Sequence, residues 1–227
     1  MEQRSPEWFA ARCGKVTASR VADVTARIKS GWGASRANYL AELVAERLTG
    51  IPANGYVNGP MLRGIEMEPE AITAYEFYSG KDVEPVGFIG HPSISESGAS
   101  PDGHVGKDGV LEVKCPNTST HIDTLLGKAV PHKYALQIQW QLACSGRKWG
   151  DFVSYDPRMP EELKLFVRRV PRDENKIKEL ESDVIAFLAE VNSKVEQLLA
   201  LTSGKTALEV VLEKSLATAR PRQHAQL

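Results

Sequence analysis

The chemically most suggestive part of the sequence is a pattern of acidic and basic residues between positions 100 and 116. Asp102 lies in the turn sequence Ser-Pro-Asp-Gly, and Glu112 and Lys114 lie further along, in the apolar run Val-Leu-Glu-Val-Lys-Cys. This run predicts a strand, on which residues two apart share a face, so the Glu112 and Lys114 side chains are expected side by side. Two carboxylates and an ammonium group in this order could bind a metal ion and activate water for hydrolysis of a phosphodiester.

The pattern is suited to a hard cation such as Mg²⁺, which binds one or two carboxylates together with waters and substrate phosphates. Asp102 and Glu112 could converge on one ion, with the backbone carbonyl of Val113 as a further ligand. Lys114 could hold the attacking water and help to remove its proton, because Mg²⁺ nearby favours a lower lysine pKa. Glu68 is a further acid for the set. Since the motif is short, a surface hairpin with a Glu–Lys pair is the structural alternative.

Composition and charge limit the class of protein. The 227 residues are 42% hydrophobic and 25% charged, which is ordinary for a globular chain and suffices for one large α/β domain or two small ones. The net charge of −1 argues against a surface that coats nucleic acid, but residues 4–36 hold seven basic side chains and two acidic ones. This asymmetry suits contact with a polyanion on one face, and a randomly charged surface is the alternative.

Cysteine spacing and hydropathy exclude several further classes. The three cysteines are scattered and form no CxxC pair, which argues against a disulfide framework, a zinc site or an iron–sulfur site and favours a reducing cytoplasm. The sequence has no apolar run long enough for a membrane span and no signal-peptide pattern at its first residues. We therefore expect no membrane partner.

Turn signals and periodicity predict the elements that position these residues. Ser5 and Pro6 predict the start of a helix that carries Trp8 and Arg12. Further helices are expected over 35–50 with a serine cap, 63–80, 131–146 and 173–201, and strands over 83–89, just before 100, 110–115, 151–155 and 163–170. This order predicts an α/β fold with a central mixed β-sheet flanked by helices. We expect one domain over residues 1–202, followed by a tail, 203–227, that is partly helical or frayed.

Several short segments, taken in order, resemble one known family. They are Trp8–Arg12, Val16–Ser19, Gly64–Glu68, Glu76–Gly80, Ser100–Gly103, Leu111–Pro116, Gln137–Gln139 and Tyr155–Met159. Asp102, Glu112 and Lys114 fit the PD-(D/E)xK nuclease motif, and the ordered set resembles the lambda exonuclease (YqaJ-type viral recombinase) family of that superfamily. The last segment supports the resemblance without an obvious chemical role.

The resemblance implies a fold and an activity. The fold is a single α/β PD-(D/E)xK nuclease-type domain, and the enzyme is a magnesium-dependent 5′-to-3′ exonuclease that acts on double-stranded DNA ends with a 5′-phosphate. It leaves 3′ single-stranded overhangs for phage-type homologous recombination, with a single-strand annealing protein as the partner. The resemblance also implies two Mg²⁺ ions per active site, for which Mn²⁺ can substitute, and a homotrimer ring that threads the DNA. It further implies a phage or prophage origin and a location in the cytoplasm of a bacterial host.

The resemblance also implies roles for individual residues. Those implied to be catalytic or metal-binding are Glu68, Asp102, Glu112, Val113 through its carbonyl, and Lys114. Lys114 would position the attacking water, and Glu68 would assist through the second ion or its waters. Glu66 and Glu70 diverge from Glu68 on the helix and are expected to be solvated.

A second group of residues is implied to bind DNA. It consists of Arg12, Thr17, Ser19, Ser100, Gln139, Met61 and Leu62. The Arg12 guanidinium, the two serine hydroxyls and the Gln139 amide would bind the terminal 5′-phosphate. Thr17 would support the loop that carries Ser19. Gln137 or Gln141 could take the place of Gln139. Met61 and Leu62, in a loop before the Glu68 helix, would wedge between the strands at the duplex end. Taken singly, each residue also fits an ordinary role in an ion pair, a helix cap, a turn or packing.

Two other functions stay open on the sequence. Another PD-(D/E)xK nuclease, such as a restriction-type endonuclease, would cut closed circular DNA, which an exonuclease that needs an end would not. A non-catalytic DNA-end-binding adaptor for an annealing protein would bind DNA equally well after Lys114→Ala and would release no nucleotide. A Cas4-like nuclease is disfavoured because the cysteines that hold its cluster are missing.

Overall fold

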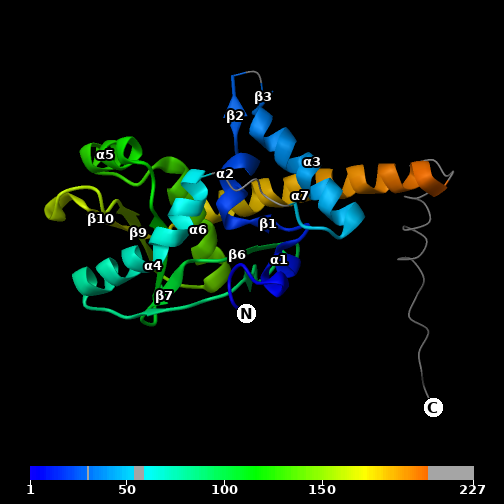
Figure 1. Ribbon diagram of the computed structural model, residues 1–227. Helices are drawn as coiled ribbons and strands as arrows, with labels where there is room; N and C mark the ends of the chain where they lie inside the picture. The colour runs from blue at the N-terminus through cyan, green and yellow to red at the C-terminus, as the bar shows by residue number, and fades with distance from the viewer. Residues whose placement is uncertain (30, 54–58, 204–227) are drawn as a thin grey trace, which may run out of the picture.

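The computed structural model describes residues 1–29, 31–53 and 59–203, and Figure 1 labels its elements. The helices are α1 (Pro6–Arg12), α2 (Val21–Val24), α3 (Ala34–Thr49), α4 (Gly59–Ser79), α5 (Thr118–Gly127), α6 (His132–Ser145) and α7 (Glu174–Ser203), with 3-10 turns η1 (Ala18–Arg20) and η2 (Glu161–Leu163). The strands are β1 (Val16–Thr17), β2 (Arg27–Ile28), β3 (Gly31–Trp32), β4 (Val83–Glu84), β5 (Ile89–Gly90), β6 (Ser97–Ala99), β7 (Gly103–Val105), β8 (Gly109–Lys114), β9 (Trp149–Tyr155) and β10 (Leu165–Pro171).

A five-stranded mixed sheet forms the centre of the fold. Its strand order is β10-β9-β8-β7-β4, with β8 parallel to β9 and the other neighbours antiparallel. Because parallel neighbours need a crossover connection, the chain leaves β8, runs through α5 and α6, and returns as β9. The central mixed sheet flanked by helices that the sequence predicted is confirmed.

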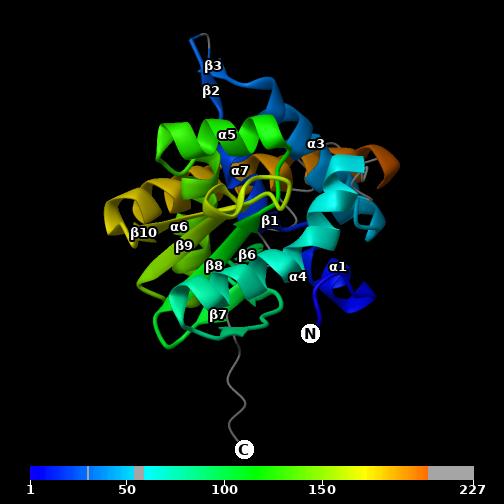
Figure 2. The ribbon, with the colours of Figure 1, turned by 60° about the vertical axis from the view of Figure 1, so that its left-hand side comes forward.

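Strand β8 is covered by α4 on one face of the sheet and by α6 on the other (Figure 2). Leu111 and Val113 are buried in the cluster that includes α4, and Val110 is buried in the cluster that includes α6. Alternation along the strand therefore puts Glu112 and Lys114 on one face, as the sequence predicted, and the structure shows that this face is covered by α6. A strand covered on both faces is usually apolar almost throughout, so these two side chains are the exceptions.

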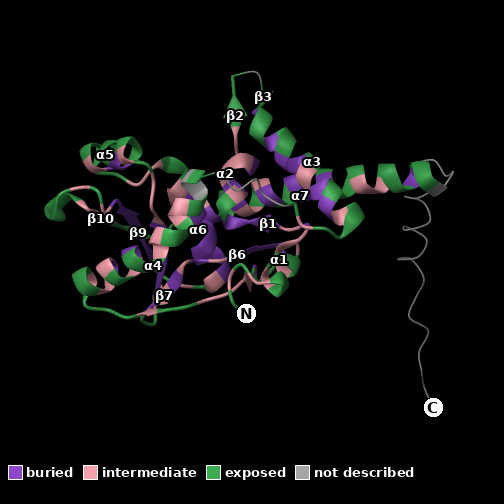
Figure 3. Ribbon diagram, viewed as in Figure 1, coloured by how far each residue is buried: buried purple, intermediate pink, exposed green. Residues whose placement is uncertain are grey.

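A second core lies beside the sheet, where α3 packs along α7, and Figure 3 shows buried residues along the two facing helices. Tyr39 of α3 stacks on Phe187 of α7, with ring centroids 5.6 Å apart. Val16 and Ala18, in β1 and η1, are buried in the same core. This core fixes the backbone of the segment that carries Ser19.

The ends of several elements differ from the expected ones. The cap that starts α1 is confirmed, since Ser5 Oγ accepts a 3.2 Å hydrogen bond from the Trp8 N–H. Helix α4 begins at Gly59, so Met61 and Leu62 lie in its first turn and not in a preceding loop. Helix α3 begins one residue before the predicted cap, and α5 and the hairpin β2-β3 were not predicted. The strand expected just before 100 is β6, but its pairing with β1 and β5 was not predicted. The single strand expected over 83–89 is wrong, because the segment holds two short strands, β4 and β5, that belong to different sheets. The strands β1, β2, β3 and β5 are two residues long, which is too short for alternation of apolar and polar residues to reveal them.

Two expectations concern the membrane and the tail. Across the described ranges, the structure contains no helix with both the length and the apolar character of a membrane span. Helix α7 continues to Ser203, and the rest of the expected tail, 204–227, lies outside the described residues. The division between 1–202 and 203–227 therefore stays a prediction.

Candidate active site

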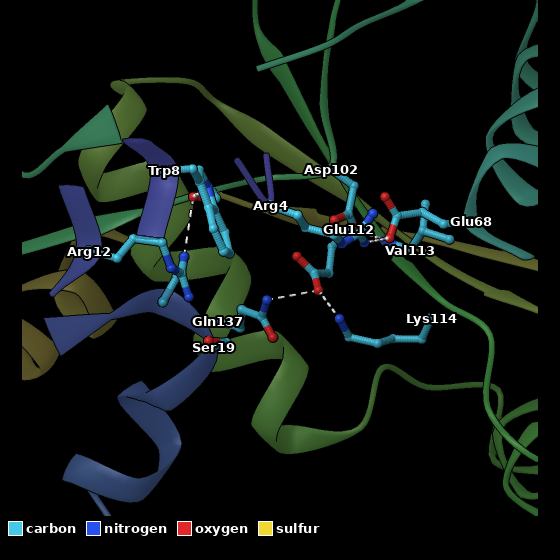
Figure 4. A pocket seen from close by; sticks show the side chains of 12 residues that line it. Arg4, Trp8, Arg12, Ser19, Glu68, Asp102, Glu112, Val113, Lys114 and Gln137 are labelled. Carbon is cyan, nitrogen blue, oxygen red and sulfur yellow. Dashed lines mark hydrogen bonds and ion pairs between the residues drawn. The ribbon is translucent and has the colours of Figure 1, made fainter. Parts of the chain in front are cut away.

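One cleft is lined by the N-terminal segment, α4, the end of β8 and α6 (Figure 4). Its lining residues are Arg4, Trp8, Arg12, Ala18, Ser19, Glu68, Ser100, Asp102, Glu112, Val113, Lys114 and Gln137. The cleft therefore brings together the carboxylates and the lysine of the expected metal site with Arg12, Ser19 and Ser100 of the expected phosphate site. These residues come from segments that are far apart in the chain.

Glu112 is almost fully buried, with 1% of its surface exposed. Gln137 Nε2 donates to Oε1 at 2.8 Å, Gln141 Nε2 donates to Oε2 at 2.5 Å, and Lys114 forms an ion pair with Oε1. The two glutamines are four apart on α6, so they lie on one face of the helix and reach the carboxylate together. One cation and two neutral donors thus satisfy a charge that would otherwise be costly to bury.

Asp102 is fixed to the same strand by two hydrogen bonds. Its backbone N–H donates to Leu111 O at 3.0 Å, and its Oδ2 accepts from the Val113 N–H at 2.6 Å. The Ser-Pro-Asp-Gly turn therefore presents the carboxylate to the end of β8. Burial and then the charge of Glu112 raise the pKa of Asp102 well above its ordinary value.

Lys114 is a protonated donor in this arrangement. Burial lowers its pKa, but the carboxylates of Glu112 and Asp102 raise it more, so the pKa lies above the ordinary lysine value. We expected nearby Mg²⁺ to favour a lower lysine pKa, but the direct contact with Glu112 acts in the opposite direction. A protonated Lys114 can orient a water molecule by donating a hydrogen bond, but it cannot take a proton from that water.

Glu68 reaches the cleft from α4, and its Oε2 pairs with Arg4 Nη2 at 2.5 Å. Its neighbour Glu66 is exposed, as expected. Glu70 is also exposed but accepts a 2.7 Å hydrogen bond from the Tyr155 hydroxyl, so it helps to hold α4 against β9 rather than being fully solvated. The structure therefore brings only the middle one of the three acids to the cleft.

The segment Tyr155–Met159, which had no role on sequence grounds, ties α4 to the end of β8. Asp156 is fully buried and accepts hydrogen bonds from Arg158 and from the Thr118 hydroxyl. It also accepts one of 3.2 Å from Arg63 of α4, whose second nitrogen donates to Pro116 O at 3.0 Å. Asp156 therefore positions the helix that carries the cleft carboxylate.

The other side of the cleft can hold an anion. Arg12 lies over the Trp8 ring, 4.0 Å from its centroid, and its Nη1 donates to Ser100 Oγ at 3.2 Å. Trp8 Nε1 donates to the same hydroxyl at 2.9 Å, and Ser19 Oγ lies 3.3 Å from Thr17 Oγ1. Burial lowers the pKa of Arg12 to about 10, so it stays a cation at neutral pH. Within the described ranges no carboxylate forms an ion pair with it, so its charge is free to bind a phosphate between two hydroxyls.

Gln139 does not lie in the cleft, in contrast to its expected role in DNA binding. Its Nε2 donates to Pro171 O at 2.8 Å, and its Oε1 accepts from the Asp173 N–H at 3.0 Å, so it holds the start of α7. Gln137, two residues earlier and on another face of α6, lines the cleft beside Glu112. Both glutamines were candidates because the periodicity of an almost wholly buried helix does not indicate which face meets the site.

The remaining DNA-binding candidates lie at the margin of the site. Thr17 is buried and reaches the cleft only through its contact with Ser19. Leu62 is 51% exposed in the first turn of α4, and the Met61 side chain lies outside the described residues, so the wedge hypothesis stays a prediction. Arg4 also lines the cleft but was not a candidate on sequence grounds, where its only signal was its membership of the basic cluster in residues 4–36.

The donor set of the cleft fits a hard divalent cation. In the described part of the chain, no three Asp, Glu, His or Cys side chains form a metal-binding group by themselves. Asp102, Glu112 and the carbonyl of Val113 offer oxygen only, which suits Mg²⁺ because this ion keeps several waters and substrate oxygens. Burial and then the charge of Glu112 raise the pKa of Asp102, and a divalent cation bound here would offset the repulsion between the carboxylates.

The family model of the YqaJ-like viral recombinase domain matches residues 7–148. An alkaline exonuclease, LHK-Exo from Laribacter hongkongensis, is 49% identical over 88% of this chain and 99% of its own, with a TM-score of 0.82, and its complex with dAMP gives 0.83. A phage-related exonuclease from Haemophilus somnus is 16% identical, with 81% and 96% covered and a TM-score of 0.67, which shows a shared fold. No curated sequence matches.

These matches agree with the order of motifs along the chain. The family model covers more than half of the residues and includes every residue that lines the cleft except Arg4. The 49% identical relative is covered over nearly its whole length. The chain therefore belongs to the YqaJ-like viral recombinase domain family.

Proposed function

We propose that this protein is a magnesium-dependent exonuclease that digests one strand of linear double-stranded DNA in the 5′-to-3′ direction from a 5′-phosphorylated end. The 3′ single-stranded overhang would serve phage-type recombination in the cytoplasm of a bacterial host. The product class is supported by the relative that was crystallised with dAMP, a deoxynucleoside monophosphate. A single-strand annealing protein as the partner and a homotrimer ring as the assembly belong to the same proposal.

The observation that carries the proposal is that the carboxylate–lysine set and the anion site share one cleft. Asp102, Glu112 and Lys114 alone would suit an endonuclease equally well. Arg12 and Ser100, on the other side of the cleft, add a site for a phosphate next to the reacting centre. An enzyme that cleaves at a fixed distance from a DNA end must bind the terminal phosphate and the scissile linkage at the same time.

Each side chain of the cleft has a separate task in this proposal. Arg12 and Ser100 bind the terminal phosphate and so set how far the strand enters. Gln137 and Gln141 hold the Glu112 carboxylate in place by hydrogen bonds, and Lys114 orients the attacking water.

Asp102, Glu112 and the Val113 carbonyl would hold Mg²⁺, with Glu68 near a second ion. When bound, Mg²⁺ neutralises charge on the phosphate and lowers the pKa of a bound water. The burial of Glu112 and the two hydrogen bonds that fix Asp102 keep these oxygens in place before any ion binds.

The proposal is tested by nucleotide release from linear duplex DNA with Mg²⁺. Ends would carry a 5′-phosphate or a 5′-hydroxyl, each strand would be labelled separately to give the polarity, and closed circular DNA would be a further substrate. We expect release from the 5′-labelled strand of phosphorylated ends, loss of release in Lys114→Ala, and full release in Lys148→Gln. Lys148 is a matched control because it is an exposed lysine paired with Asp108 at the opposite end of β8.

Other outcomes of this experiment would contradict the proposal. Cleavage of the circle would indicate an endonuclease, and end binding without release, equal in the wild type and Lys114→Ala, would indicate a DNA-end-binding adaptor. The ring is tested separately by sedimentation, where a stable species near the 24.9 kDa of one chain at working concentration would exclude it.

A further inference from the structure

The N-terminal segment is bound along the edge of the cleft. Gln3 Nε2 donates to Val86 O at 2.8 Å and to Pro101 O at 2.7 Å, next to Asp102. Met1 lies against Gly87, where an added Cβ would come within 2.5 Å of Met1 O. Residues 1–3 are therefore held against the segment that leads into the turn carrying Asp102.

Arg4 has a backbone conformation that few side chains adopt. Its φ is +67°, in the left-handed region, and Lys128 is the other described non-glycine residue with a positive φ. Such a conformation costs free energy in a residue with a Cβ, and it persists only when the surroundings impose it. Here Gln3 is anchored on one side, and Ser5 caps α1 on the other. The backbone is thereby held in the one turn that brings Arg4 into the lining of the cleft.

The Arg4 side chain is only partly used by the protein. Its Nη2 pairs with Glu68 Oε2 at 2.5 Å, and 42% of the side chain is exposed (Figure 4). In the described part of the chain, Glu68 is its sole hydrogen-bond or ion-pair partner. A guanidinium has five N–H donors, so most of its donors have no partner among the described residues. Beside Glu68 and Asp102, the cleft thus holds a second cation in addition to Arg12.

We propose that Arg4 binds an internal backbone phosphate of the DNA strand being cut, and that it pairs with Glu68 when no divalent cation and no DNA compete for the two groups. The inference rests on the proposed nuclease function and adds a phosphate contact to it. The terminal phosphate is assigned to Arg12, because Arg12 lies with Trp8, Ser19 and Ser100, whereas Arg4 lies beside the carboxylates.

This assignment predicts effects of opposite sign on two ligands. Arg4→Gln removes a phosphate contact, so it weakens DNA binding. The same substitution removes the cation that competes for Glu68, so it strengthens binding of Mg²⁺ or Mn²⁺ in the absence of DNA. An arginine that only stabilised the fold would not change the two affinities in opposite directions.

The first test measures DNA affinity at several salt concentrations, with Mg²⁺ and duplexes whose terminal linkages cannot be hydrolysed. We expect Arg4→Gln to bind roughly tenfold more weakly, with the slope of log affinity against log salt smaller by about 0.9, on 5′-phosphate and 5′-hydroxyl ends alike. Arg12→Gln should weaken binding only to 5′-phosphate ends, and Lys148→Gln should change neither. Arg4→Lys should restore the salt slope, which excludes a folding defect as the cause.

The second test measures binding of Mn²⁺ without DNA by calorimetry. We expect a several-fold tighter dissociation constant for Arg4→Gln than for the wild type, and no change for Lys148→Gln. An unchanged salt slope, a loss confined to 5′-phosphate ends, or weaker metal binding would overturn the assignment of Arg4. Failure of the wild type to bind DNA ends at all would instead overturn the proposed function.

Discussion

Two buried carboxylates on neighbouring strands, Asp151 of β9 and Glu112 of β8, are stabilised in different ways. Asp151 is 3% exposed and accepts two 2.8 Å hydrogen bonds from Arg169 and one of 2.8 Å from the Tyr75 hydroxyl. It pairs in register with Leu111, so it lies on the α4 face of the sheet. Glu112 lies on the α6 face, opens to the cleft, and is held by two amides and a lysine.

The difference lies in the partners and not in the depth of burial. Arginine is a rigid fork that fixes a carboxylate in one geometry, which suits a structural ion pair. Amides are neutral, and lysine is a point charge on a flexible stem that can turn toward a water or a phosphate. A buried acid is therefore a candidate for catalysis when its donors are neutral or movable and a cleft reaches it, whereas an acid enclosed by a guanidinium contributes to stability.

The largest expected effect is at Glu112→Gln. We expect nucleotide release to fall by about 10³-fold or more, equal to about 4 kcal/mol in the activation barrier. The urea midpoint should change little, because Gln141 Oε1, which is buried and without a hydrogen-bond partner among the described residues, can turn to accept from the new amide. Single-turnover release and urea unfolding measure the two effects. Activity within tenfold of the wild type would show that the Glu112 charge is not needed.

The next effect is at Asp151→Asn, which should act on stability alone. Loss of the charge leaves Arg169 and the buried Tyr75 hydroxyl with a weaker acceptor, so the free energy of unfolding should fall by about 2 kcal/mol. The value is at the low end for a broken buried pair because half of the Arg169 side chain is reached by water. Nucleotide release well below the melting temperature should match the wild type. A large loss of activity at unchanged stability would remove the distinction between the two acids.

A smaller effect separates two glutamines of α6. Gln141→Met removes one donor from Glu112, so we expect release about tenfold slower, equal to about 1.4 kcal/mol, with the KM for DNA unchanged. Gln139→Met is the matched control, because Gln139 holds the start of α7. It should lower the free energy of unfolding by about 1 kcal/mol and leave release unchanged. Equal effects of both variants on release would mean that α6 acts through its packing.

The smallest effect concerns a third carboxylate, Asp156, and is a change in the free energy of unfolding at low pH. Burial raises its pKa, but the hydrogen bonds from Arg158 and Thr118 lower it more, so its pKa in the folded state lies below the ordinary value. Its contribution to stability is therefore fully present above the unfolded-state pKa of about 3.9 and is lost as the pH falls below it. Between about pH 4 and pH 2, Asp156→Asn should show a shallower fall of unfolding free energy than the wild type, by at most about 1.4 kcal/mol per pH unit. Parallel curves for the two proteins would contradict this.

The sequence predicted the parts of the site that depend on local pattern. Alternation in β8 was sufficient to place Glu112 and Lys114 together, and the turn signature was sufficient to place Asp102. It did not predict which glutamine faces Glu112, because α6 is buried almost all round and has no polar face. Nor did it predict Arg4, whose place depends on hydrogen bonds from Gln3 to carbonyls more than eighty residues away. Contacts between distant segments leave no periodic signal in the chain.

The parallel pairing of β8 with β9 has a consequence for the order in which the chain folds during its synthesis. β8 ends at Lys114, but the strand beside it starts at Trp149, and the two glutamines that hold Glu112 lie between them on α6. Chains leave the ribosome from the N-terminus, and pairings between distant segments form late. A nascent chain therefore carries Asp102, Glu112 and Lys114 in an unassembled state until α6 and β9, which ends at Tyr155, have also emerged.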